Sequence, residues 1–386
     1  MGWIVEVDPF TTTAIKKYYS MGNFSHEDIL CMSDGKTVYL TEDNSPCCLY
    51  KFIADEKNNY TTGQLYAYKQ NANAAGGSWL ALPMQLDSLL ITHDIAFRYG
   101  ATTFSRLEGI CKNADETKIY FSETGNDACN YIYALFYGAM PAKQIQYLDT
   151  IYGSPADGIY SDYYGRVWEF DISTKACKPL IEGGTAADGK TNFSNPDNLA
   201  FVQYGTKREF LFMQEDLNGI SFGRLPPHII SGADIIPEIY CLDLSKEDVT
   251  INDLQRFAIG PKGSETCGIT FSNDGNTVFM NVMHPNVYNS FPFNNSVTLA
   301  VTGLRDYLLS EVTNISDVQS TTFSIYPNPA TRELHFSKIA DVVLYDVNGK
   351  LMLMKENVRS IDVSRLEKGV YFIDAVEYGI YKIIFQ

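Results

Sequence analysis

The chain has 386 residues, a length that suits a large domain followed by a smaller one. Its formal net charge of −16 excludes nucleic acid as a partner, because no basic face could neutralise the phosphates. No apolar run approaches the roughly 20 residues needed to cross a bilayer, so we expect no transmembrane segment. The 26 Tyr and 22 Phe suit half-buried strand faces, and long amphipathic helical patterns are scarce, which predicts an all-β protein.

The first ten residues have the pattern of a β-strand whose beginning is missing. They show neither the basic start nor the apolar stretch of a signal peptide. The eight cysteines have no zinc-binding spacing, and most lie in apolar strand-like runs, which predicts buried free thiols. Cys47 and Cys48 are adjacent in a loop-like stretch, where a disulfide is the alternative.

Four segments share a pattern of an acid, a short apolar stretch, a polar turn and an alternating aromatic or β-branched strand. They are HEDILCMSDGKTVYLTED (26–43), LEGICKNADETKIYFSETGND (107–127), PDNLAFVQYGTKREFLFMQED (196–216) and SETCGITFSNDGNTVFMNV (264–282). Turn residues such as Asp34-Gly35 and Asp274-Gly275 suit hairpins between the two strands. Consecutive antiparallel strands repeated in this way predict a β-propeller of about 4 to 6 blades over residues 1–312. A β-sandwich is the alternative.

An acid stands at the start of the innermost strand of each repeat. These acids are Glu27, Glu108, Asp197 and Glu265. Radial repetition should bring them together at one mouth of the central channel. Two carboxylates about 4 Å apart repel by roughly 4 kcal/mol at an effective dielectric near 20, so such a cluster needs cations or protons. Oxygen ligands favour Ca²⁺, Mg²⁺, Mn²⁺ or Fe³⁺ over zinc. The alternative is that each acid caps its strand or pairs with a nearby Arg or Lys.

Further polar residues flank these acids. Arg106 lies two positions before Glu108, on the same side of a strand, and an arginine there is suited to gripping a phosphate. His26, Asn198 and His284 are the other candidates, although either histidine could be a satisfied core residue.

Second strands of the repeats also run into acids, namely Glu42-Asp43, Glu123 and Glu215-Asp216. We expect the acid pair Glu42-Asp43 to contribute to the same site. No role is predicted for His93, His228 or His335.

The C-terminal residues form a separate module, 323–386, after a polar linker at 313–322. Alternating strands occur in residues 342–354, 361–375 and 381–385, with turns at Asn348-Gly349 and Lys368-Gly369, which predicts a small Ig-like β-sandwich.

This module resembles the C-terminal sorting domain of type IX secretion substrates. The resemblance is carried by its Y-P-N-P-A opening, its D-x-x-G-K centre and its L-x-x-G-x-Y ending. It implies export from a Bacteroidetes-type bacterium, the type IX secretion machinery as a partner, and release or anchoring at the cell surface. It also implies a signal peptide upstream of Met1. A generic carbohydrate-binding or fibronectin-like sandwich is the alternative.

The first 305 or so residues resemble the PhoX-type alkaline phosphatases, which are propellers with iron and calcium at the active site. The matching stretches occur in the order of that family. They are GWIVEVDPF (2–10), FSHEDILCMSDGKTVYL (24–40), LYKF (49–52), GQLYAY (63–68), SRLEG (105–109), NPDNLAF (195–201) and GPKGSETCGITFSNDGNTVFMNVMHP (260–285).

By this resemblance, Glu27 corresponds to the metal-binding glutamate of a His-Glu motif. Arg106 and Glu108 correspond to an Arg-x-Glu motif, in which they would bind phosphate and metal respectively. Asp197 and Glu265 fall at downstream acidic positions.

At the acid pair the family has Gly-Asp-Asp, whereas this chain has Thr-Glu-Asp-Asn, so either Glu42 or Asp43 could be the ligand. The family also has an upstream segment with a Cys-Glu-Glu motif, in which the cysteine bridges the irons. Nothing in this chain corresponds to that segment. The resemblance therefore predicts an incomplete propeller that is metal-poor and inactive as written, either as a truncated product or as a gene model begun at an internal Met.

The predicted function is metal-dependent hydrolysis of phosphate esters, with phosphomonoesters as substrates. The metals would act as Lewis acids, and Arg106 would stabilise charge on the phosphoryl oxygens. Two alternatives remain: a non-catalytic calcium-binding surface propeller that binds protein or glycan, and a propeller lactonase-type hydrolase with one divalent cation.

Overall fold

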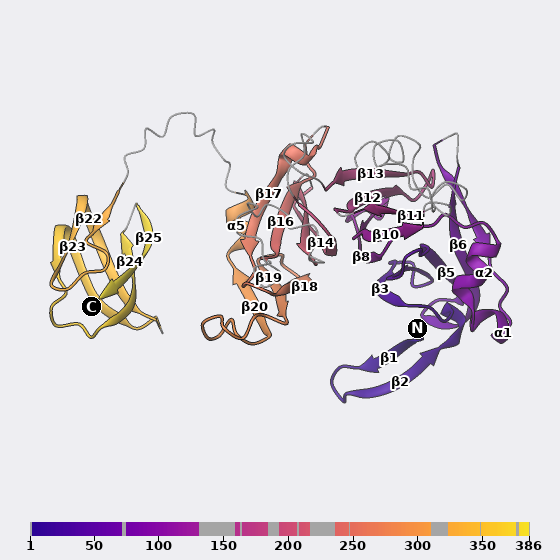
Figure 1. The fold of residues 1–386 in the computed structure, drawn as a ribbon, viewed down its shortest axis with the longest axis horizontal. Helices are drawn as coiled ribbons and strands as arrows, with labels where there is room; N and C mark the ends of the chain where they lie inside the picture. Colours follow the sequence, from indigo (N-terminus) through magenta and orange to yellow (C-terminus); the bar gives the residue numbers. More distant parts are fainter. Residues whose placement is uncertain are drawn as a thin grey trace. The chain divides into compact units, whose positions relative to one another are not determined.

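The computed structural model describes residues 2–71, 75–130, 159–162, 164–183, 193–206, 208–216, 236–246, 248–309, 323–347, 349–375 and 378–385. Nearly all of its elements are β-strands (Figure 1), which confirms the predicted all-β class. The chain divides into two compact units, residues 1–310 and 311–386, which are described separately. The predicted linker and the turn residue Asn348 lie outside the described residues. Within those residues, no helix has the length and apolar character needed to cross a membrane.

Among the described residues, the first unit contains four antiparallel sheets of three or more strands, here called blades 1 to 4. Blade 1 has β3 (His26–Cys31), β4 (Thr37–Glu42), β5 (Tyr50–Glu56), β6 (Asn59–Gln70) and β7 (Gly77–Ala81). Blade 2 has β8 (Leu107–Lys112), β9 (Lys118–Glu123), β12 (Arg166–Asp171) and β13 (Cys177–Glu182). Blade 3 has β14 (Pro196–Tyr204), β15 (Arg208–Glu215), β16 (Glu238–Asp243) and β17 (Leu254–Ile259). Blade 4 has β18 (Glu265–Phe271), β19 (Thr277–Met283) and β20 (Val297–Thr302).

Smaller elements accompany the blades. Two hairpins lie outside them: β1 (Ile4–Asp8) with β2 (Thr13–Tyr18), and β10 (Asn126–Asn130) with β11 (Ile159–Asp162). The helices that the structure describes in this unit are short: 3-10 turns at Tyr19–Met21 and Ile251–Asp253, α1 (Leu86–Leu89), α2 (Thr92–Arg98) and α5 (Leu304–Leu309).

The first strands of successive blades lie next to one another. Strand β3 contacts β8, β8 contacts β14, and β14 contacts β18. Inner strands in sequence order, each opening an antiparallel sheet, are the arrangement of a propeller. The propeller prediction is confirmed, with four blades among the described residues.

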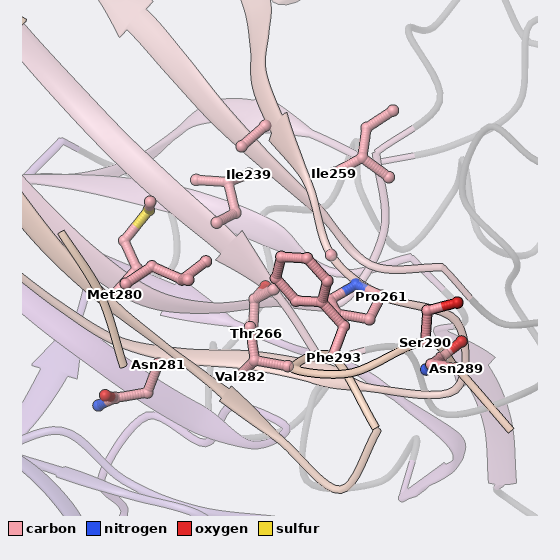
Figure 2. Close-up of a pocket in the computed structure, with 13 residues that line it drawn as sticks. Ile239, Ile259, Pro261, Thr266, Met280, Asn281, Val282, Asn289, Ser290 and Phe293 are labelled. Carbon is pink, nitrogen blue, oxygen red and sulfur yellow. The ribbon is translucent and has the colours of Figure 1, made fainter. Parts of the chain in front are cut away.

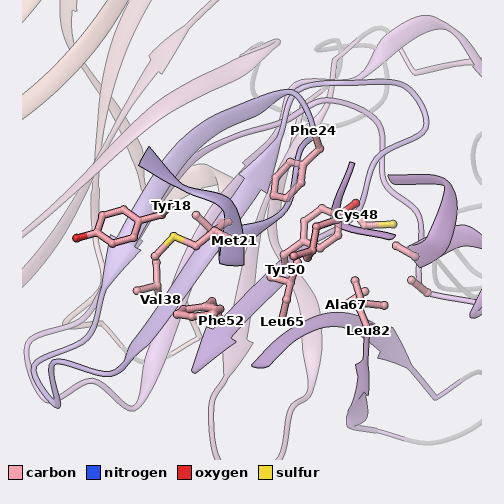
Figure 3. Close-up of a cluster of buried hydrophobic side chains, with 14 of the residues drawn as sticks. Tyr18, Met21, Phe24, Val38, Cys48, Tyr50, Phe52, Leu65, Ala67 and Leu82 are labelled. Carbon is pink, nitrogen blue, oxygen red and sulfur yellow. The ribbon is translucent and has the colours of Figure 1, made fainter. Parts of the chain in front are cut away.

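Hydrophobic clusters fill the spaces within and between the blades. One cluster belongs to blade 1 and its helices, and it includes Phe24, Tyr50 and Phe52, which are fully buried (Figure 3). Three further clusters join blade 1 to blade 2, blade 2 to blade 3, and blade 3 to blade 4. Many of the aromatic residues counted in the sequence therefore pack within and between these sheets.

A polar contact also repeats from blade to blade. In blades 1 to 3, the side chain of the penultimate residue of the second strand donates a hydrogen bond to a backbone carbonyl on the inner strand of the following blade. The three bonds run from Thr41 Oγ1 to Glu108 O (2.5 Å), from Ser122 Oγ to Asp197 O (2.5 Å), and from Gln214 Nε2 to Cys267 O (3.3 Å). We call these bonds the blade latches.

The cysteine side chains that the structure describes are free thiols. They are Cys31, Cys47, Cys48, Cys111, Cys177, Cys241 and Cys267. Burial raises the pKa of the Cys47 and Cys48 thiols well above the usual value, and the charge of Glu42 adds to this effect.

The second unit is a small β-sandwich, as predicted. Its strands are β21 (Ile325–Tyr326), β22 (Glu333–Asp346), β23 (Leu351–Asp362), β24 (Gly369–Ala375) and β25 (Gly379–Phe385). Strand β22 pairs with β21, β23 and β24, and bulges in its pairing with β23 let these long strands curve over one core. That core contains only residues of this unit, among them Leu334, Leu344 and Ile373, which are fully buried.

Candidate active site

Three of the predicted acids occupy the same structural position. Each follows the last regular pair between the first two strands of its blade, at the start of a bulge. The pairs are His26 with Glu42, Leu107 with Glu123, and Pro196 with Glu215. The acids Glu27, Glu108 and Asp197 are the next residues along each inner strand. A bulge redirects the side chains beside it, so the repeat places three carboxylates alike.

Glu265 does not share this position. It pairs directly with Met283, and the bulge of β18 lies farther along, between Cys267 and Thr270. The expectation that all four acids lie at one phase of the repeat is therefore wrong for blade 4. Glu265 nevertheless interacts electrostatically with Glu27, Asp197 and Asp216.

Arg106 lies among the carboxylates of three blades. Its Nε is 2.9 Å from Asp43 Oδ1, and its Nη2 is 2.5 Å from Glu108 Oε1 and 3.2 Å from Asp216 Oδ2. The residue precedes β8 and has a left-handed backbone with φ of +59°. This conformation costs a non-glycine residue on the order of 1 kcal/mol. Because Arg106 lies before the strand and has this backbone conformation, its guanidinium points toward the acids. Its position does not follow from the alternation of side chains along a strand, which was the basis of the prediction.

We call Glu27, Asp43, Glu108, Asp197, Asp216 and Glu265, with Arg106 among them, the acid cluster. Burial raises the pKa of Glu27, and the charges of Asp43 and Asp28 raise it further. Burial likewise raises the pKa of Glu265, together with the charge of Asp216. Burial opposes the charge on Arg106, but Glu108, Asp43 and Asp216 outweigh it and raise its pKa. The cluster thus holds more negative charge than one guanidinium neutralises.

Glu108 and Asp197 form a tightly coupled pair at the centre of this cluster. Their side chains are hydrogen-bonded to each other, and Glu108 is 3% exposed and Asp197 4% exposed. Burial raises the pKa of Asp197 to about 8 and raises that of Glu108 well above its usual value. Without a cation, the two carboxyl groups are expected to share a proton near neutral pH.

A cavity of about 250 Å³ lies beside these acids. It is lined by pairs of residues from three inner strands: Glu27 and Asp28, Asn198 and Leu199, and Gly268 and Ile269. The cavity is therefore lined by the inner strands of blades 1, 3 and 4, as expected of the channel in a propeller.

Glu42 is turned away from the acid cluster. Its carboxylate accepts hydrogen bonds from the Cys48 amide (3.1 Å) and the Tyr50 hydroxyl (3.0 Å), and it lies 2.6 Å from His93 Nδ1. Glu42 is 1% exposed, so this set of contacts is buried. Of the acid pair, Asp43 is the member that reaches Arg106.

The other candidates fall into two groups. His26 places Nε2 3.0 Å from Gly22 O and packs against Phe24, and burial lowers its pKa to about 4, as in a core histidine. Asn198 bonds the Asp197 carboxylate at 2.7 Å, and His284 interacts electrostatically with Glu265. Asn198 and His284 therefore adjoin the cluster, whereas His26 does not contribute a contact to it.

Sequence reasoning left Asp216 out of the site, although a signal for it existed. Asp216 follows the glutamate that ends β15, as Asp43 follows the glutamate that ends β4. The amide of Asp43 bonds Ser25 O, and that of Asp216 bonds Asn195 O, at equivalent places in blades 1 and 3. Aligning the ends of the second strands would have found it.

The acid cluster fits hard cations in its chemistry. Its six acids offer carboxylate oxygens, which are the donors that hard cations such as calcium and ferric iron prefer. Glu108 Oε1 is buried and accepts no hydrogen bond, although it is ion-paired with Arg106. Among the described residues, no three or more His, Cys, Asp or Glu side chains lie close enough together to hold a metal ion as they stand.

Comparison with known families decides the affiliation of this chain. Residues 1–286 match the model of the family Alkaline phosphatase PhoX. The chain belongs to the PhoX alkaline phosphatase family. Residues 324–384 match the model of a secretion system C-terminal sorting domain.

Solved structures support the fold of this PhoX family member. It is similar to Pseudomonas fluorescens PhoX in complex with vanadate, a transition state analogue, with 23% identity and a TM-score of 0.60. That match covers 78% of this chain and 57% of the other, so this chain spans little more than half the length of its relative.

A propeller domain of the Trilobed protease from Pyrococcus furiosus is also similar, with 10% identity, a TM-score of 0.27, and coverage of 94% of this chain and 82% of the other. No curated protein sequence matches the chain.

Proposed function

We propose that this protein hydrolyses phosphate esters, with phosphomonoesters as substrates, at the acid cluster. The observation that supports the proposal is that Arg106 pairs with carboxylates from three blades, and that three further acids, Glu27, Asp197 and Glu265, interact electrostatically with members of the same group. A structural ion pair needs one acid for each arginine. A group of acids in excess of the basic residues, four of which (Glu27, Glu108, Asp197 and Glu265) have a raised pKa, is instead typical of a site that holds cations.

Arg106 would bind and orient the phosphoryl group. A guanidinium can donate two parallel hydrogen bonds to phosphate oxygens, and its charge would stabilise the charge that develops on them. Asp43 and Asp216 hold two sides of the guanidinium, so they would fix its direction. The cluster is only partly exposed, which would limit the access of water to the bound ester.

Calcium and iron are the proposed metals, by analogy with the family. Glu27, Glu108, Asp197, Asp216 and Glu265 would hold them, with Asp43 rather than Glu42 as the acid from blade 1. Bound metals would supply Lewis-acid polarisation of the phosphoryl group. The proton shared by Glu108 and Asp197 would leave when cations bind.

The test is hydrolysis of a chromogenic phosphate ester by the full chain with calcium and iron supplied, and by a version extended upstream. In the version that hydrolyses the ester, Glu108→Gln is expected to lower the rate at least about a hundredfold, because it keeps the shape of the side chain but removes its charge. The matched control is Glu169→Gln, since Glu169 is a buried acid of the same blade that pairs with Lys118 outside the cluster.

Absence of metal-dependent turnover in both versions would rule out the proposal. Turnover of lactones with calcium alone would instead indicate a lactonase-type hydrolase.

The sorting domain points to secretion and the cell surface. We further propose that the type IX secretion machinery recognises this unit. Deletion of residues 323–386 should leave the phosphatase inside the producing cell, as measured by fractionation.

A further inference from the structure

Cys267 in blade 4 occupies the position that an acid holds in each of the other three blades. The segment CGITFSNDGNTV (267–278) aligns without a gap on EDILCMSDGKTV (27–38), so that Asp274-Gly275 falls on the turn Asp34-Gly35 and Cys267 falls on Glu27. Glu265 lies two residues earlier, which explains why it does not share the phase of the other site acids.

The blade latches identify the same position independently of the turns. In blades 2 and 3, the backbone carbonyl that accepts the latch belongs to the site acid, Glu108 or Asp197. In blade 4, the carbonyl that accepts the latch belongs to Cys267. The repeat therefore places a thiol in blade 4 where the other three blades place a carboxylate.

The side chain of Cys267 lies on the same face of β18 as that of Glu265. Residues 265–267 pair regularly with β19 before the bulge, so alternate residues share a face. Thr266, between them, is fully buried and lines a separate apolar pocket with Ile239 and Val282 (Figure 2). Cys267 and Glu265 therefore point to the other side of the strand, away from this pocket.

Contacts place Cys267 beside the acid cluster. Asn198 bonds the Asp197 carboxylate at 2.7 Å, and its Oδ1 accepts a hydrogen bond from the amide of Gly268, the residue after Cys267. Cys267 is partly buried and interacts electrostatically with four acids of the cluster, from blades 1, 3 and 4. These acids are Glu27, Asp197, Asp216 and Glu265.

Glu108 gives a separate indication that the cluster holds a ligand. It is 3% exposed, and its Oε1 accepts no hydrogen bond, although it is ion-paired with Arg106. A buried oxygen without a hydrogen bond in a cluster of acids is explained by a bound ion. The described side chains do not lie close enough together to hold one as they stand. Because a cysteine side chain turns about one bond, its sulfur can approach an ion without movement of the backbone.

We propose that Cys267 is a thiolate ligand of a transition-metal ion in the acid cluster. Sulfur donors favour ions such as iron, cobalt and zinc, whereas carboxylates alone also accept calcium. Blade 4 thus makes its part of the cluster selective for a transition metal. Binding forms a metal–sulfur bond and releases the thiol proton to water. The inference rests on the cation binding of the proposed function and not on the hydrolysis step.

The test follows the metal–sulfur bond by spectroscopy and does not depend on activity. Cobalt(II) is titrated into the full chain, and the wild type is expected to develop a thiolate-to-cobalt charge-transfer band in the near ultraviolet. Cys267→Ser should lose this band and bind cobalt at least about tenfold more weakly by calorimetry, because loss of even a partner of a ligand costs that much. Cys267→Asp, which has the acid of blade 3 at this position, should lose the band and bind calcium at least as tightly as the wild type.

Cys31→Ser is the matched control and should keep the band, because Cys31 is an exposed thiol at the opposite end of β3 from Glu27. Alkylation mapped by mass spectrometry needs no variant, and cobalt should slow the alkylation of Cys267 but not that of Cys31. A wild type without the band, a band that persists in Cys267→Ser, or alkylation of Cys267 unchanged by cobalt overturns the inference. If the band depends on Cys267 but phosphate esters are not hydrolysed, the ligand assignment holds and the proposed activity fails.

Discussion

Glu42 and Asp43 are neighbours in sequence, but their carboxylates serve different parts of the molecule. Glu42 is buried against Cys48, Tyr50 and His93, whereas Asp43 is ion-paired with Arg106 in the acid cluster. Consecutive residues of a strand point to opposite faces, so only one of them could lie in the site. The sequence alone gave no reason to choose between them.

This division predicts opposite effects for two conservative substitutions. Asp43→Asn should weaken calcium binding about tenfold, because it removes a charge from the cluster, while the free energy of unfolding without metal changes by less than about 1 kcal/mol. Glu42→Gln should lower the free energy of unfolding by about 2 kcal/mol and leave calcium affinity within about threefold. Calorimetric titration and urea unfolding measure the two quantities. The reverse pattern would show that Glu42 is the ligand.

His93 should make stability depend on pH. Burial disfavours its charged form, but the hydrogen bond and the charge of Glu42 outweigh this and raise its pKa above the usual 6.5. A raised folded-state pKa adds stability that is fully present below 6.5 and is lost as the pH rises through the folded value. His93→Ala should therefore cost about 2 kcal/mol at a pH near 5.5 and clearly less near pH 9, measured by urea unfolding. His335→Ala, in the second unit, is the control, and an equal cost at both pH values would contradict the prediction.

At the scale of elements, the inner strands of neighbouring blades are held together by side-chain hydrogen bonds to the backbone and by one close approach of two backbones. The blade latches connect each second strand to the next inner strand. Asp28 Oδ2 accepts a hydrogen bond from the Ile110 amide at 3.0 Å, and Gly109 brings β8 against β14 with no side chain between them. The spacing of the carboxylates depends on this close approach.

Gly109→Ala should disturb both the fold and the site. A Cβ atom at this position would lie 2.5 Å from Asp197 O and 2.6 Å from Leu199 N, and both are backbone atoms that cannot move alone. We expect a loss of about 2 to 3 kcal/mol in unfolding free energy and weaker calcium binding, because Glu108 and Asp197 are displaced. Gly2→Ala, where a Cβ would meet nothing within 4 Å, should change neither quantity. Wild-type calcium affinity in Gly109→Ala would show that strand spacing does not control the site.

The strands and turns were predictable because they depend on local sequence. Alternating aromatic or β-branched residues and polar turns, which are Asp-Gly in blades 1 and 4, identified the first two strands of each blade, and repetition identified the propeller. The positions of Arg106, Asp216 and Glu265 depend on a left-handed residue, the end of a strand and the location of a bulge. Asp216 could have been found by aligning the ends of the second strands, but the alternating pattern gives no sign of a left-handed residue at Arg106 or of where the bulge of β18 lies. The blade latches escaped prediction because they join residues of different blades.

At the scale of the whole molecule, the two units have separate hydrophobic cores. The core of the second unit draws only on residues 323–385, and the clusters of the first unit lie between residues 18 and 304. We therefore expect two independent thermal transitions.

Leu334→Ala should lower only the transition of the second unit, and Phe52→Ala only that of the first, by several degrees each in scanning calorimetry. Both side chains are fully buried. A single transition that shifts in both variants would show that the units unfold together.

The acid cluster takes its members from positions as distant along the chain as Glu27 and Glu265. Because no three consecutive blades contain them all, a polypeptide that has formed only some of the four blades would lack part of the proposed cation site. Catalytic activity would then appear only after all four of these blades have formed. Metal uptake during refolding should appear as the last kinetic phase, after the strands have formed.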